Sequence, residues 1–177
     1  MRAWRFAVPA LTLFSLLGMS AAASAQDVYV VYSGKDRALK NQIVGAFPED
    51  VKVKQYNADL LALADYTGKQ KVVTIISRAE VVVIIGDKTM EVLKKTKIKA
   101  NVLIVGSVKK NVKSTGTLLY VVSNRTDIRG LTGSKLQVNS QADMNDERAV
   151  KSSKVIVVNE NAVTLPQAIL KIAQIFI

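Results

Sequence analysis

The feature that most constrains the fold is a run of five consecutive β-branched residues, Val81–Ile85, which Glu80 and Gly86 flank. Residues of this type favour strands. A run with no polar alternation indicates a strand that is buried on both faces. Strands covered on both faces occur almost only in parallel sheets, where crossover helices pack on either side. This segment therefore predicts an α/β fold.

The rest of the chain alternates similar strands with helical patterns. Apolar spacing in 69–78 favours a helix, although its β-branched residues also suit a strand. Strands separated by helices imply βαβ units. We therefore expect a three-layer α/β/α sandwich with a mostly parallel sheet of about five strands. The predicted strands are 27–33, 51–56, 80–86, 102–106, 117–122 and 154–158, and the predicted helices are 38–47, 57–66, 69–78, 87–96 and 165–177.

The first 25 residues have the three-part pattern of a secretory signal peptide. Arg2 and Arg5 precede an apolar run, and Ala23-Ser24-Ala25 provides a small-x-small cleavage site. The alternative is a retained membrane anchor, but the apolar run is shorter than the ~20 residues that a spanning helix needs. We expect cleavage, a periplasmic or secreted bacterial protein with no stable membrane span, and a single domain at 26–177.

Composition excludes several classes of chemistry. The chain contains neither cysteine nor histidine, so disulfides, thiolate or imidazole metal sites and Ser-His-Asp triads are excluded. No glycine pattern matches a P-loop or a dinucleotide fingerprint. The carboxylates Asp36, Asp87 and Asp127 are scattered and form no evident pair. We expect no catalysis, no cofactor and no metal.

Polar residues follow the predicted strands. Ligands of open α/β sheets bind outside the carboxyl ends of the strands, so these residues are the candidate ligand contacts. Ser33 and Gly34 would offer a hydroxyl and backbone N–H groups to an anion at a helix N-terminus, and Lys35 would add charge. The alternative is a plain strand-to-helix turn, with Asp87 as an ordinary N-cap. The candidates are Ser33, Gly34, Lys35, Asn57, Gly86, Asp87, Lys88, Thr89, Ser107 and Asn124.

These segments resemble a known family. With the signal peptide, VYVVYSGKD, EVVVIIGDKTMEVL and NVLIVGS look like an ABC-type substrate-binding protein, specifically one lobe of a type I periplasmic-binding-protein-like component. The resemblance covers about residues 27–125, and its motifs would also describe flavodoxin-like domains. It implies a Rossmann-like lobe that binds a small solute. Family members have two lobes that trap the ligand between them, whereas this chain supplies one, so a homodimer or a partner would have to complete the cleft.

A lysine-rich stretch and a long polar segment complete the candidates. The formal net charge is +11, and 92–113 holds seven lysines and no acid. This stretch, with Lys94, Lys95, Lys109 and Lys110 as candidate contacts, would meet an acidic partner, or it is a solvated face. Nucleic acid is not expected, because few aromatic residues are interleaved. Residues 126–153 are either a lid or an irregular crossover, and the terminal 175–177 either docks on the core or stays exposed.

Two functions follow from these observations. The first is a periplasmic, non-catalytic, single-lobe binding protein that holds a small, anionic solute at the strand ends. The second is an accessory subunit of a bacterial envelope complex that kept the fold and lost the ligand. The sequence leaves the ligand, the partner and the oligomeric state open.

Overall fold

A computed structural model describes residues 27–110, 112–126, 128–129, 138–140 and 144–177. The predicted signal peptide and much of the polar segment 126–153 lie outside the described residues. No helix in the described part of the chain is long and apolar enough to cross a membrane.

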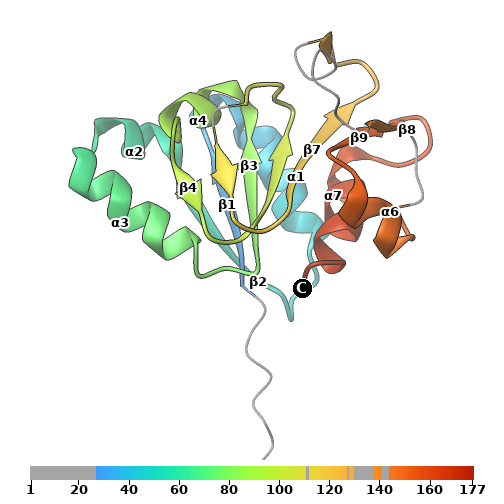
Figure 1. The fold of residues 1–177 in the computed structure, drawn as a ribbon, viewed down its shortest axis with the longest axis horizontal. Helices are drawn as coiled ribbons and strands as arrows, with labels where there is room; N and C mark the ends of the chain where they lie inside the picture. The colour runs from blue at the N-terminus through green and yellow to red at the C-terminus, as the bar shows by residue number, and fades with distance from the viewer. Residues whose placement is uncertain (1–26, 111, 127, 130–137, 141–143) are drawn as a thin grey trace, which may run out of the picture.

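The centre of the domain is an all-parallel sheet (Figure 1). Six strands lie in the order β2-β1-β3-β5-β7-β9, and the short β8 extends the sheet beyond β9. The sheet thus has more strands than the roughly five expected, while its parallel character is confirmed. The strands are β1 (Asp27–Tyr32), β2 (Lys52–Asn57), β3 (Val81–Ile85), β5 (Asn101–Val105), β7 (Leu118–Ser123), β8 (Val138–Ser140) and β9 (Val155–Val158).

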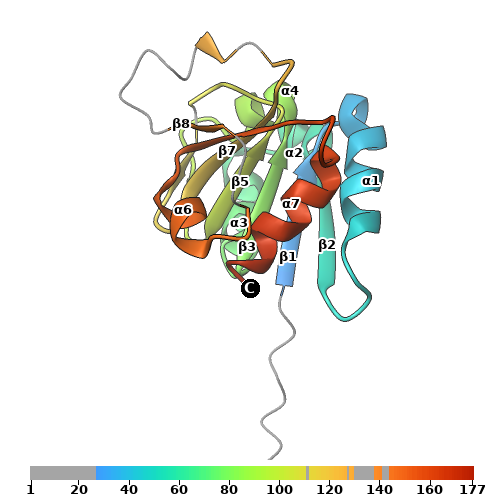
Figure 2. The same ribbon diagram turned by 90° about the vertical axis from the view of Figure 1, so that its right-hand side faces the viewer.

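Helices cover both faces of the sheet (Figure 2), which gives the expected sandwich. α1 (Arg37–Ala46) and α7 (Leu165–Gln174) pack together on one face. Val150 of α6 (Glu147–Ser152) belongs to the same core cluster. The other face carries α2 (Ala58–Leu63), α3 (Tyr66–Ile76) and α4 (Gly86–Val92). A short 3-10 turn, η1 (Gly34–Asp36), joins β1 to α1.

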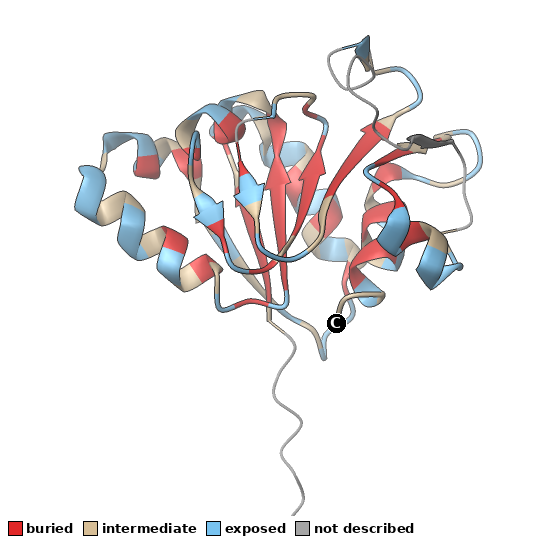
Figure 3. Cartoon of the chain, viewed as in Figure 1, coloured by how far each residue is buried: buried red, intermediate tan, exposed pale blue. Residues whose placement is uncertain are grey.

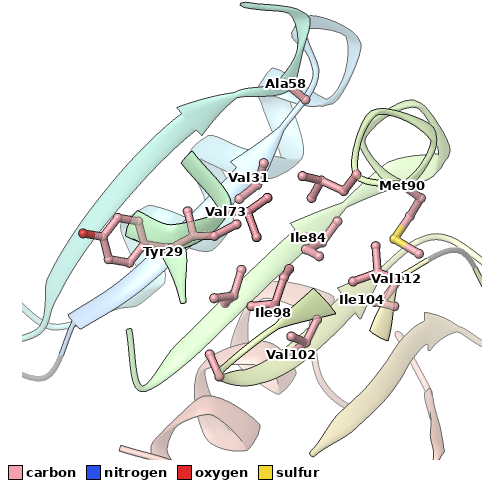
Figure 4. Close-up of a cluster of buried hydrophobic side chains, with 14 of the residues drawn as sticks. Tyr29, Val31, Ala58, Val73, Ile84, Met90, Ile98, Val102, Ile104 and Val112 are labelled. Atoms are coloured by element: carbon pink, nitrogen blue, oxygen red, sulfur yellow. The ribbon is translucent and has the colours of Figure 1, made fainter. Parts of the chain in front are cut away.

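Each face of the sheet has its own hydrophobic core. Successive side chains of a strand point to opposite faces, so Val82 and Ile84 belong to the core beneath α2–α4, while Val81 and Val83 belong to the core beneath α1 and α7. All five residues of β3 are buried, as the run of β-branched residues predicts (Figure 3). Figure 4 shows the first of these cores, in which Met90 of α4 packs near the central strands.

Two local features differ from the sequence-based expectations, and one alternative is decided. α4 ends at Val92, before the predicted end near Thr96, because the chain turns at Lys95 with a φ of 62°. The following residues form a second, two-stranded parallel sheet, β4 (Lys97–Ile98) with β6 (Lys113–Ser114). The chain end, 175–177, packs against the core beneath α7, which favours the docked alternative.

The strand order fixes where polar side chains can gather. The chain moves outward from β1 to β2, then returns to β3 on the other side of β1. This reversal between β1 and β3 is a topological switch point, where doubly wound sheets usually bind their ligands. Because all strands are parallel, their carboxyl ends, and the predicted site residues that follow them, lie along one edge.

Candidate functional site

Most of the predicted ligand residues meet in one polar network at the carboxyl ends of β1, β2, β3 and β5. We call this network the strand-end cluster. Most of its contacts involve Asp36 and Asp59, which are not among the ligand residues that the sequence predicts. The cluster consists of Ser33, Gly34, Asp36, Asn57, Asp59, Gly86, Asp87, Lys88 and Ser107.

Asp59 joins the ends of three strands. Its Oδ2 accepts a hydrogen bond from the backbone N–H of Gly34 at 2.7 Å, and its Oδ1 lies 2.7 Å from Lys88 Nζ. Asn57, the N-cap of α2, accepts from the backbone N–H of Asp59 at 2.9 Å. The N–H that we expected to receive a ligand anion is therefore already bound to a carboxylate of the chain itself.

The surroundings of Asp59 favour its charged form. The ion pair with Lys88, followed by the hydrogen bond from Gly34, lowers the pKa of the Asp59 carboxyl below its ordinary value, against a smaller opposing effect of desolvation. This carboxylate is consequently a fixed negative charge at neutral pH. Lys88 is exposed and can contact a solute as well as Asp59.

Asp36 bridges the two loops on either side of the switch point. Ser33, which is fully buried, donates its hydroxyl to Asp36 Oδ2 at 2.6 Å. The same carboxylate lies over Gly86, where an added Cβ would come within 2.5 Å of Oδ2. Gly86 has a φ of +78°, a left-handed conformation that glycine adopts without strain. These contacts join the loop after β1 to the start of α4.

Asp87 does not have the capping role that we considered for it. α4 begins at Gly86 with Ile85 at the N-cap position, so Asp87 lies inside the first turn. There its negative charge still favours the positive end of the helix dipole. Its Oδ1 accepts a hydrogen bond from the buried Ser107 hydroxyl at 2.7 Å, which extends the cluster to the end of β5.

Three other predicted residues form no hydrogen bond or ion pair with the described residues of the cluster. Lys35 is exposed on η1. Asn124 is exposed after β7, and its backbone N–H donates to Val158 of the neighbouring strand. Thr89 is fully buried in α4, and its hydroxyl has no hydrogen-bond partner among the described residues. A solute would reach Thr89 only after neighbouring side chains moved.

The lysine stretch is partly neutralised by an acid that precedes it. Glu91 lies 3.1 Å from Lys109 Nζ and 3.9 Å from Lys94 Nζ. Lys94, just after α4, and Lys109, in the loop after β5, are therefore ion-paired. Lys95 and Lys110 are exposed.

Three surface hollows lie away from the strand-end cluster. One, of about 480 Å³, lies between α1 and the start of α7 and includes Gln42 and Gln167. A second, of about 330 Å³, lies between α3 and β4, and a third, of about 430 Å³, lies along α3. None of the three is lined by a predicted ligand residue. In the described part of the chain, no group of three acidic side chains is placed to hold a metal ion.

The comparisons with known proteins identify no relative. No family model, no curated protein and no solved structure matches this chain. The structure shows an α/β domain with a parallel six-strand sheet, while the resemblance to ABC-type substrate-binding proteins rests on the sequence segments alone.

Proposed function

We propose that this chain is a non-catalytic binding protein of the bacterial periplasm, resembling one lobe of an ABC-type substrate-binding component. In this proposal it holds a small polar solute at the strand-end cluster. The observation that carries the proposal is the polar network that Asp36 and Asp59 form across the β1–β3 switch point. Doubly wound sheets bind their ligands at such a point.

An anionic group on the solute would have to be held by Lys35 and Lys88 against the carboxylates of Asp36, Asp59 and Asp87. The backbone donor of Gly34 is occupied by Asp59, so the remaining attraction for an anion comes from the exposed side chains of Lys35 and Lys88. Gly106, at the end of β5, is exposed with a φ of +62° and open space over its Cα, which lets a solute approach the backbone closely. A second copy of the chain, or a partner, would cover the open side of the solute.

Native mass spectrometry of the mature protein, purified gently from the periplasm, tests this proposal. We expect a stoichiometric extra mass of a small molecule on a monomer or dimer. Ser33→Ala and Asp87→Asn should remove that mass, because they delete contacts that shape the cluster. The matched control is Ser152→Ala on α6, whose exposed hydroxyl bonds only the helix backbone. A bare protein, or loss of the mass in the control alone, would overturn the proposal.

An interaction module is the second candidate function, and one observation favours it. Leu60, Leu63 and Tyr66 are 67%, 86% and 77% exposed where α2 meets α3. Exposed apolar groups of this size mark interaction sites when they are contiguous. Leu60 and Leu63 share one helix face because they are three residues apart.

The same spectra distinguish the two functions. An accessory subunit would carry a second envelope polypeptide in fixed ratio rather than a small mass. Leu63→Lys should remove that polypeptide, and Ser33→Ala should leave it bound. If the lysine stretch contacts the partner, substitution of Lys94, Lys95, Lys109 and Lys110 by Glu should also remove the polypeptide.

A further inference from the structure

A basic hollow lies between α3 and β4, at the opposite edge of the sheet from the strand-end cluster. Ser77 and Arg78 follow α3 and lead into β3, and Lys99 leads into β5, so the hollow lies near the amino ends of these strands. Figure 1 shows β4 beside α3. The volume of the hollow is about 330 Å³, at the small end of the range for ligand clefts.

Three cationic side chains line this hollow without a carboxylate among its lining residues: Arg78, Lys97 and Lys99. None of them forms an ion pair with another described residue, whereas five other lysines in the described part of the chain do. Lys54 pairs with Asp27, and Lys151 pairs with Glu147. Unneutralised positive charge in a concave surface attracts anions, because the low-dielectric walls concentrate the field.

The register of the small sheet places a fourth cation beside the hollow. Lys97 of β4 and Lys113 of β6 are partners in the parallel ladder. Neighbouring strands lie about 4.8 Å apart, and like charges on paired residues destabilise a sheet. A bound anion would reduce this repulsion, so binding at the hollow should stabilise the β4–β6 pair.

Hydrogen-bond donors also point to an oxyanion. The Ser77 hydroxyl oxygen accepts from the backbone N–H of Lys99 at 3.0 Å, so the hydroxyl proton is available for a ligand. The planar guanidinium of Arg78 matches the geometry of phosphate oxygens, which it can bind with two parallel hydrogen bonds.

The end of α3 opposes anion binding only weakly. A helix C-terminus carries a partial charge of about −0.5. Here its last carbonyls, those of Val73, Ile75 and Ile76, accept from the backbone N–H groups of the turn that follows. The three full positive charges therefore dominate the potential in the hollow.

We propose that this basic hollow is a binding site for a phosphate-class oxyanion, held by Arg78, Lys97 and Lys99 with a hydrogen bond from Ser77. The group is either a free phosphate compound or the phosphate of a lipid headgroup, since both present the same oxygens. The site is separate from the strand-end cluster and from the solute proposed there.

Titration of the purified ¹⁵N-labelled protein with inorganic phosphate, followed by NMR, tests the site. We expect saturable shifts in the amide signals of residues 77, 78, 97 and 99 at millimolar phosphate. Arg78→Gln and Lys97→Gln should each weaken binding about tenfold, because each removes a charge-assisted hydrogen bond. Both side chains are exposed, so the variants should fold, which thermal unfolding checks.

The matched control is Lys171→Gln, which removes one exposed positive charge from α7 on the other face of the sheet. Equal weakening in this control would mean that net charge alone attracts phosphate, and it would overturn the proposal. Linear, unsaturable shifts would overturn it as well. If Ser33→Ala abolishes phosphate binding while Arg78→Gln does not, phosphate binds at the strand-end cluster, and the hollow is not the site.

Vesicles identify the source of the phosphate group. Sedimentation with phosphatidylcholine vesicles, with and without phosphatidylglycerol, measures binding to a headgroup. Binding that requires phosphatidylglycerol and is lost in Arg78→Gln identifies a lipid. Saturable binding of free phosphate without vesicle binding identifies a soluble compound. If neither probe binds in a manner that Arg78→Gln reduces, the hollow is not an oxyanion site.

Discussion

The carboxylate of Asp36 occupies the space in which a side chain at Gly86 would begin. A Cβ at that position would lie 2.5 Å from Asp36 Oδ2 and 2.8 Å from Asp36 Cγ. The two residues follow different strands, so this single contact sets how closely the loops after β1 and β3 approach each other. Asp36 thus lies between these two loops at the β1–β3 switch point.

Gly86→Ala should destabilise the protein. The left-handed backbone at a φ of +78° costs an alanine about 1–2 kcal/mol, and the overlap with Asp36 adds to this cost. Gly45→Ala is the matched control, because nothing lies within 4 Å of its added Cβ in α1. We expect that control to stabilise the protein by about 0.5–1 kcal/mol, since alanine favours helices over glycine. Urea unfolding of both variants measures the difference.

The combination Gly86→Ala with Asp36→Ala separates the two causes. Removing the carboxylate should recover the part of the loss that comes from overlap and leave the part that comes from the backbone conformation. Asp36→Ala alone also loses the hydrogen bond from Ser33, so it is measured as well. If the loss in the double variant equals the sum of the losses in the two single variants, the contact between Asp36 and Gly86 does not set the cost.

Asp59 should make stability depend on pH in the acid range. Lys88 and the Gly34 N–H lower the pKa of Asp59 in the folded protein below its ordinary value of 3.8, so the unfolded chain takes up the proton first. The stabilisation is therefore fully present above pH 3.8 and is lost as the pH falls through the folded pKa. Asp59→Asn and Lys88→Gln should both flatten this dependence. Thermal unfolding between neutral and acid pH measures it.

Asp50→Asn is the control for this effect, because it removes an exposed carboxylate from the turn between α1 and β2. That variant should keep the acid dependence of the unmodified protein. An equally steep acid dependence in Asp59→Asn would show that the ion pair with Lys88 contributes nothing in solution.

Ser107→Ala should cost about 1.5 kcal/mol of stability. The buried hydroxyl donates to Asp87 Oδ1 at 2.7 Å and accepts from the backbone N–H of Lys109 at 3.3 Å. A hydrogen bond to a charged group contributes about 1.5–3 kcal/mol, and the lower end applies because Asp87 is partly exposed and regains water. Ser152→Ala, at an exposed hydroxyl, should change stability by less than about 0.5 kcal/mol. Equal effects in urea unfolding would contradict the role of Ser107.

The sequence predicts the strands well and their side-chain contacts poorly, for a physical reason. A strand that is buried on both faces needs an unbroken run of apolar residues, which is visible in the sequence. The buried strand β3 and the parallel sheet are both confirmed. Asn57 is the N-cap of α2, a role that depends on neighbouring residues in the sequence. Asp59 contacts Gly34 and Lys88, and Asp36 lies against Gly86. These residues are far apart in the sequence, so no local sequence pattern predicts their contacts.

The sequence does not predict the short β4–β6 pair, for a related reason. Two-residue strands carry no periodicity, and Lys97 and Lys113 are poor strand formers side by side. The sequence places Gly86 at the end of the predicted strand 80–86, with Asp87 as the cap of the following helix. The helix begins one residue earlier because a glycine with positive φ can enter it directly from β3.

Thr89→Val tests whether a buried hydroxyl is kept for structure or for a ligand. The Thr89 hydroxyl is fully buried and has no hydrogen-bond partner among the described residues, a state that costs about 1–3 kcal/mol. Valine has nearly the same shape without the hydroxyl, so the substitution should raise the free energy of unfolding by about 1 kcal/mol. Thr74→Val is the control, because that exposed hydroxyl already donates to the Gln70 carbonyl. It should not raise the free energy of unfolding.

A Thr89→Val variant that is less stable than the unmodified protein would show that the hydroxyl has a partner in solution. A variant that is more stable yet no longer carries a small-molecule mass would instead identify the solute as that partner.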